Sequence, residues 1–179
     1  MGPPENDPFY VARAIDNAED ALVLAHDVFD QGAGEDVWRR YRDLREDLDD
    51  ARRQLEWGDA RSAYRHAVQV RDGVLDLLQD SQNLPVPAST AERALKQAQE
   101  AYDRTLTELG SNPKESALRW RREAQGQLVK ARSAFQKRDY RDSILHAKLV
   151  ERNLDEAITA QRSAEQRSNG GGRTARRAV

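Results

Sequence analysis

The sequence predicts an all-α protein of six long antiparallel helices, arranged as two homologous three-helix units. Apolar residues recur at spacings of three and four in six segments, as in helices that bury one face. No segment shows the apolar–polar alternation that is typical of strands. Residues 8–80 align without a gap on residues 88–160, with 15 identities in 73 pairs. This internal match indicates a duplicated unit.

The first unit is expected over residues 1–82. Asp7 is a suitable N-cap and Pro8 suits the first helical position, so together they predict a helix start. A turn is expected at Gly58, after which Asp59 should cap the third helix. The apolar stripes of the three helices span residues 15–29, 37–55 and 60–78.

Residues 83–88 (Asn-Leu-Pro-Val-Pro-Ala) break the helical pattern and form the predicted linker. The second unit follows over residues 89–165. Capping boxes are expected at Ser89-x-x-Glu92 and at Asn112-Pro113-x-Glu115. The apolar stripes span residues 95–109, 117–135 and 140–158. The short linker favours intimate packing, either as two bundles side by side or as one continuous array.

The C-terminal segment, residues 166–179, has a different composition from the two units. It contains consecutive glycines and several arginines, and the apolar period fades before it begins. A segment with so few apolar residues cannot bury enough surface to order itself. We therefore predict a disordered basic tail over residues 166–179.

Composition excludes several classes of site. There are no cysteines, so disulfides, thiolate metal sites and a cysteine nucleophile are ruled out. The three histidines form no carboxylate–histidine ligand pattern, and the glycines form no phosphate loop, so no metal or cofactor is expected. The longest apolar run, residues 21–25, is far too short to span a membrane. With no secretory pattern at the N-terminus, a cytoplasmic protein is expected.

Charge is distributed unevenly between the two halves. Residues 1–80 carry 10 basic and 19 acidic side chains, and residues 81–179 carry 19 basic and 12 acidic side chains. The fifth helix, whose apolar stripe spans residues 117–135, has few acids of its own, which predicts a basic binding surface. Protein partners are expected there, including copies of the chain itself, whereas the overall pI of about 6.0 disfavours nucleic acid. The predicted binding residues are Arg119, Arg121, Arg122 and Arg132.

The turn between the second and third helix of each unit carries a pattern of small residues. The first copy reads Ala51-x3-Leu55-x2-Gly58-Asp59-x3-Ala63-x3-Ala67, and residues 131–147 form its counterpart. This pattern resembles the turn between the two helices of tetratricopeptide repeats. The resemblance covers about 20 residues per unit, and it implies a tight helical hairpin in a protein-binding scaffold. The internal period of 80 and the additional helix depart from that family.

An arginine–histidine pair also occurs once in each unit. Arg61-x4-His66 and Arg141-x4-His146 resemble the ribonuclease motif of the HEPN superfamily, whose helical domains cut RNA at a site formed by two such motifs. The resemblance implies that histidine acts as a general acid or base and that arginine holds the phosphate. The alternative is a structural histidine, because His66 lies at the edge of the apolar stripe.

Two functions therefore remain open at this stage. The favoured one is a non-catalytic helical scaffold or adaptor that binds protein partners through complementary charged faces. The other is a HEPN-like ribonuclease, or an inactive relative, with its site at the two arginine–histidine pairs. The enzyme requires the two pairs to face one another across a groove.

Overall fold

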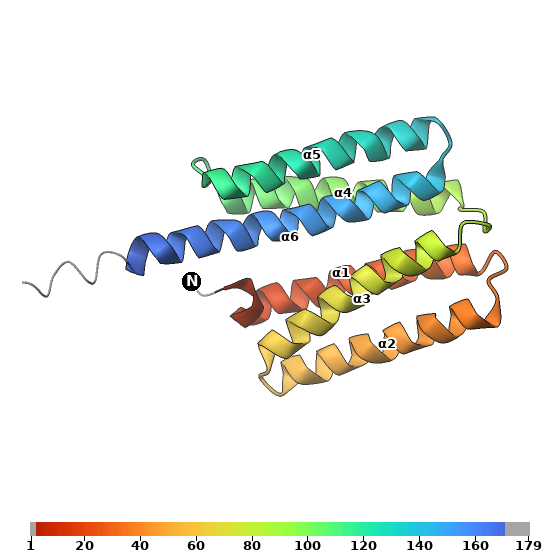
Figure 1. Ribbon diagram of the computed structural model, residues 1–179, viewed down its shortest axis with the longest axis horizontal. Coiled ribbons are helices and arrows are strands. Elements are labelled where there is room, and N and C mark those ends of the chain that lie inside the picture. Colours follow the sequence, from red (N-terminus) through yellow and green to blue (C-terminus); the bar gives the residue numbers. More distant parts are fainter. Residues whose placement is uncertain (1–2, 171–179) are drawn as a thin grey trace, which may run out of the picture.

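The computed structural model describes residues 3–170, and every regular element in this range is helical (Figure 1). This confirms the predicted all-α class. A short 3-10 turn, Pro4–Asn6, precedes the long helices. The helices are α1 (Pro8–Phe29), α2 (Glu35–Glu56), α3 (Ala60–Asp80), α4 (Ala88–Leu109), α5 (Glu115–Gln136) and α6 (Tyr140–Gly170).

The two triplets have corresponding helix boundaries. Helices of the first triplet begin at positions 8, 35 and 60, and those of the second begin at positions 88, 115 and 140, so the offset between them is constant. In both triplets the third helix packs against the other two, while the first and second contact each other less. This arrangement is the one the internal match predicts, and duplication remains its interpretation.

The two units share one hydrophobic core. Helix α1 contacts α4, and α3 contacts α6, so these four helices lie between α2 and α5, the outer helices in Figure 1. A single cluster of buried residues contains Leu48 and Val70 of the first unit together with Leu128 and Val150 of the second. Helix α1 buries 11 of its 22 residues, more than any other helix, as expected of a helix in the middle of the array. The units therefore form one continuous array.

Two of the predicted helix starts are confirmed in atomic detail. Asp7 accepts a hydrogen bond from the backbone N–H of Phe9 at 3.0 Å, with proline at the start of α1. Asp59 accepts one from the N–H of Ser62 at 3.1 Å. Asp139, at the matched position, accepts one from the N–H of Asp142 at 3.1 Å. These caps satisfy amides that the first helical turn leaves without partners.

The two predicted capping boxes are wrong. Helix α4 begins one residue before Ser89, because the carbonyl of Pro87 already accepts hydrogen bonds from the N–H groups of the first turn. Asn112 does not cap α5, whose N-cap is Lys114. The backbone N–H of Lys114 instead donates to Oε1 of Gln161 on α6, at 2.8 Å. A side chain from the neighbouring helix α6 therefore takes the place of the local box.

The predicted tail boundary at residue 166 is also wrong. Helix α6 continues to Gly170, so residues 166–170 are helical. Intrahelical bonds such as the one from Oγ of Ser168 to the carbonyl of Ala164, at 3.1 Å, support this last turn. The rest of the predicted tail, residues 171–179, lies outside the described residues.

Ion pairs cross the interface between the units in both senses, with the cation on either unit. Arg13–Glu108 and Arg71–Asp155 take the cation from the first unit, while Arg93–Asp27 and Arg162–Asp7 take it from the second. These four pairs therefore do not draw on the opposite net charges of the two halves. The charge surplus of each half must lie elsewhere on the molecule.

A buried charge cluster lies at the same interface. Lys148 of α6 is only 1% exposed, and its Nζ bonds Glu151 at 3.0 Å and Gln97 of α4 at 3.1 Å. Its charge also acts on Asp20 of α1, although burial raises the pKa of that carboxyl. A buried ammonium group is tolerated only when it is paired and hydrogen-bonded, as Lys148 is.

Candidate functional site

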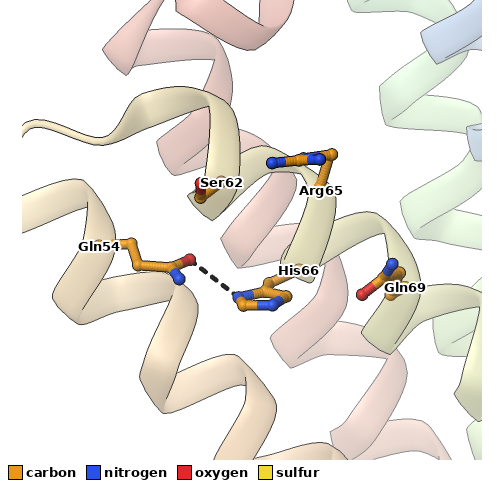
Figure 2. A pocket seen from close by; sticks show the side chains of 5 residues that line it. All are labelled: Gln54, Ser62, Arg65, His66 and Gln69. Atoms are coloured by element: carbon orange, nitrogen blue, oxygen red, sulfur yellow. Dashed lines mark hydrogen bonds between the residues drawn. The ribbon is translucent and has the colours of Figure 1, made fainter.

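His66 lies on α3 and faces the adjacent helix α2. Its Nδ1 is 2.8 Å from Oε1 of Gln54, as Figure 2 shows. The imidazole lines a shallow hollow of about 220 Å³ together with Gln54, Ser62, Arg65 and Gln69. Arg61 is not among these lining residues, because it lies at the exposed start of α3 and pairs with Glu5 at 3.4 Å. The two members of the first pair therefore do not converge on one site.

The second pair is separated in a different way. Nδ1 of His146 lies 2.6 Å from Oε1 of Gln127 on α5, and its Nε2 lies 3.3 Å from Asp142. The guanidinium of Arg141 points to the other side and donates to the backbone carbonyls of Leu78 and Leu84. Burial lowers the pKa of Arg141. This arginine ties α6 to the end of α3 and to the linker.

The two arginine–histidine pairs lie at opposite ends of the molecule. Arg141 contacts the carbonyl of Leu78 near the end of α3, whereas Arg61 lies at the start of that helix. At a rise of about 1.5 Å per residue, the intervening part of α3 separates the two arginines by about 25 Å. Figure 1 shows the cause, since α3 and α6 run in opposite directions. Neither pair has the geometry of a shared site for cutting RNA.

The four predicted basic residues occupy two different faces of α5. Arg132 bonds Gln99 of α4, and Arg121, three helical turns earlier, lies on the same side of the helix. Arg121 is half-buried there. Arg119 and Arg122 are exposed on the side that faces away from the rest of the molecule. The predicted binding set is therefore divided between the α4 side and the outward side.

The outward side of α5 carries a row of cations with few acidic partners. Among the described residues, Arg122 has one ion-pair partner, Glu115 at 3.7 Å, and Arg119, Lys130 and Lys137 have none. We call this the outward face of α5, defined by residues spaced three or four apart, which share one side of a helix. Its members are Arg119, Arg122, Gly126, Val129, Lys130, Ser133 and Lys137. Lys130 and Lys137 are not among the four predicted binding residues, although their spacing from Arg119 places them on this face.

In α2, the corresponding helix of the first unit, most cations are paired with acids. Every arginine of α2 except Arg45 forms an ion pair with a carboxylate. Arg39 pairs with Asp36 at 3.1 Å and Arg42 pairs with Glu35 at 2.6 Å, and these two arginines match Arg119 and Arg122. The cations of α2 are thus neutralised within the first unit, whereas those on the outward face of α5 are largely not.

A hollow adjoins the outward face of α5 near the hairpin. It has a volume of about 420 Å³ and lies between α5 and the first turns of α6. Val129 and Ala134 supply apolar surface, and Val129 is 59% exposed. Its other lining residues are polar or charged: Lys130, Ser133, Lys137, Asp139, Asp142 and His146. The hollow therefore combines an apolar surface with basic and acidic rims.

Other classes of site find no support in residues 3–170. No group of three or more histidine, aspartate or glutamate side chains in this range is placed to hold a metal ion. No helix in the same range is long and apolar enough to cross a membrane. No protein-family model, curated protein or solved structure matches this chain.

Proposed function

We propose that this protein is a non-catalytic helical scaffold or adaptor that binds a protein partner through the outward face of α5. The observation that carries the proposal is the row of cations Arg119, Arg122, Lys130 and Lys137, of which only Arg122 has an ion-pair partner in the described structure. A cation that the chain itself does not neutralise remains available to an acidic partner. The proposal includes the cytoplasm as the compartment.

A matched pair of variants tests this proposal. Arg119→Glu/Arg122→Glu reverses two charges on α5, and Arg39→Glu/Arg42→Glu reverses the corresponding charges on α2. Pull-downs from the source cells should recover partners with the wild type and the α2 variant, but not with the α5 variant. Thermal melts must first show that both variants fold. Equal recovery with the α5 variant would contradict the proposal.

Salt dependence gives a second, independent test. Exposed charges are screened within about 8 Å at physiological ionic strength, so partner binding should weaken as salt rises. Sedimentation of the purified protein at low and high salt tests whether the partner is another copy of the chain. Binding that is equally strong at all salt concentrations would rule out a surface governed by charge.

The ribonuclease alternative has a direct test as well. His66→Ala and His146→Ala should leave RNA intact to the same degree as the wild type, because the two histidines lie at separate hollows. RNA cleavage by the wild type that is lost in either variant would reinstate the HEPN-like interpretation.

A further inference from the structure

Gly126 lies at the centre of the outward face of α5, and a glycine inside a helix does not stabilise it. A Cβ at this position would meet no atom within 4 Å, so packing inside the chain does not require its absence. Glycine inside a helix costs about 1 kcal/mol relative to alanine. The matched residue of α2 is Glu46, so the equivalent position accepts a long side chain. The absence of a side chain at residue 126 opens the helix backbone to an external group.

The residues around Gly126 form a seam suited to another helix. Gly126, Val129 and Ser133 follow one another at spacings of three and four, as at the contact positions of packed helices. Two of the three are small, and Val129 is an exposed apolar side chain. Small residues at a seam allow two helix axes to approach closely, and a branched apolar residue supplies contact area. Lys130, Lys137 and Arg119 border this seam along one side.

Resting on the proposed function, we infer that the partner segment is an acidic amphipathic helix of a different protein, packed along the seam of Gly126, Val129 and Ser133. Its apolar residues lie over Val129 and the adjoining hollow. Its carboxylates lie over Arg119, Lys130 and Lys137. The row of cations runs from position 119 to position 137. This corresponds to about 27 Å of helix, or about five turns, which is enough to align a partner helix.

Two other occupants fit the surface less well. In a second copy of the chain, α5 is itself basic, and four of the eight carboxylates of α2 are already paired with arginines of the same helix. The α2 positions that match the seam are Glu46, Asp49 and Arg53, so this helix offers no apolar residue to Val129. Nucleic acid would bring phosphates towards Asp139 and Asp142, which line the wall of the hollow. The exposed Val129 would also gain nothing from a phosphate backbone. An acidic helix of another protein satisfies both the cations and the apolar seam.

A displayed library of helical peptides, about 21 residues long and randomised at every exposed position, tests the inference while the natural partner is still unidentified. Selection against the folded wild-type protein should enrich helices with apolar or small residues at heptad spacing and glutamate or aspartate beside them. The affinity of an enriched peptide is then measured by fluorescence anisotropy against two variants. Gly126→Leu fills the seam without changing charge, and Glu46→Leu places the same residue at the matched position of α2.

We expect Gly126→Leu to weaken binding by at least about tenfold, and Glu46→Leu to leave it unchanged. Enrichment of acidic peptides without heptad spacing, with binding that tolerates Gly126→Leu, would overturn the helix and leave the proposed function standing. A library that enriches no acidic peptide at all would overturn both. Self-association in sedimentation, or displacement of the peptide by single-stranded RNA, would replace the acidic helix with that partner.

Discussion

The α2–α3 and α5–α6 hairpins share their helix starts, their aspartate caps and the placement of a histidine, but they differ in surface charge. In the first hairpin, arginines and carboxylates on α2 pair with one another and with neighbouring residues. In the second, most cations on the outward face of α5 have no counter-ion among residues 3–170. The positions that build the core are thus alike in the two hairpins. The positions that face outward differ, which is where a difference in function would arise.

The matched helices α3 and α6 also carry opposite charges at one buried position. Arg71 of α3 and Glu151 of α6 occupy equivalent positions in the two units, and both are buried at the interface between them. Arg71 pairs with Asp155 of α6, and Glu151 pairs with Lys148. The two units therefore differ at this interface position, where each carries a buried charge of opposite sign with its own ion-pair partner.

The largest effect is expected at the buried charge cluster. Lys148→Met leaves Glu151, which is 4% exposed, without its cation, and should lower the free energy of unfolding by about 3–5 kcal/mol. Arg152→Met, one helical turn away on the exposed side, is the control and should change it by less than about 0.5 kcal/mol. Chemical denaturation measures both. Equal stability of the two variants would show that the cluster does not stabilise the folded protein.

The next effect tests whether the two outer helices are equally well packed. Leu48 of α2 is 1% exposed and Leu128 of α5 is 4% exposed, and they occupy matched positions. Truncation of either to alanine should cost about 2–5 kcal/mol, measured by urea denaturation. A large loss for Leu48→Ala with none for Leu128→Ala would mean that α5 contributes little to the shared core, contrary to its similar burial.

Asp155 should make stability depend on pH in an unusual direction. Burial raises its pKa from 3.8 to about 6, even though Arg71 acts against the shift. Between these two values the folded state keeps a proton that the unfolded state has released. The contribution of this group is therefore fully present below the unfolded pKa and is lost as pH rises through about 6, by at most about 3 kcal/mol.

The measurement is the difference between the wild type and Asp155→Asn, followed by denaturant unfolding from pH 4 to about 7. The difference removes the titration of the other carboxylates, which are common to both proteins. A difference that stays constant over this range would show that Asp155 does not retain its proton in the folded state.

The smallest effect concerns the turns of the two hairpins. Gly58 has φ +85° and the matched Arg138 has φ +61°, so a left-handed residue occurs at the same point in each turn. Arg138→Gly should relieve the strain on a residue with a side chain and stabilise the protein by about 0.5–1 kcal/mol. Gly58→Ala should destabilise it by a similar amount. Thermal melts that move in the same direction for both variants would contradict the equivalence of the two turns.

Most of the fold could be predicted because its signals are local. Spacings of three and four identify the buried stripes, and Asp7 and Asp59 mark helix starts within a few residues of their partners. The capping boxes expected at Ser89 and Asn112 do not form, because other groups satisfy the backbone at the two helix starts. The carbonyl of Pro87 already accepts the first hydrogen bonds of α4, and Gln161 of the neighbouring helix α6 accepts a hydrogen bond from the N–H of Lys114 before α5.

The candidate site could be predicted only in part. Charge counting located α5, but it did not separate the side of Arg132, which contacts α4, from the outward side. The spacing of Lys130, Lys137 and Gly126 from Arg119 places all three on the outward side. The ion pair of Lys148 with Glu151 follows from their spacing of three on one helix, whereas the bond from Lys148 to Gln97 depends on how α6 packs against α4. The separation of the two arginine–histidine pairs likewise depends on the opposite directions of α3 and α6.

The shared core also bears on how the protein is made. Helix α1 buries Ala18, Ala21 and Leu24 completely, and part of that cover comes from the second unit. While a ribosome is still adding α4 to α6, the nascent first unit exposes apolar surface that its own three helices cannot enclose. Folding to the final state must then wait until α6 has emerged, well after the synthesis of α3 is complete. During that interval the side of α1 that the second unit later covers stays exposed to solvent.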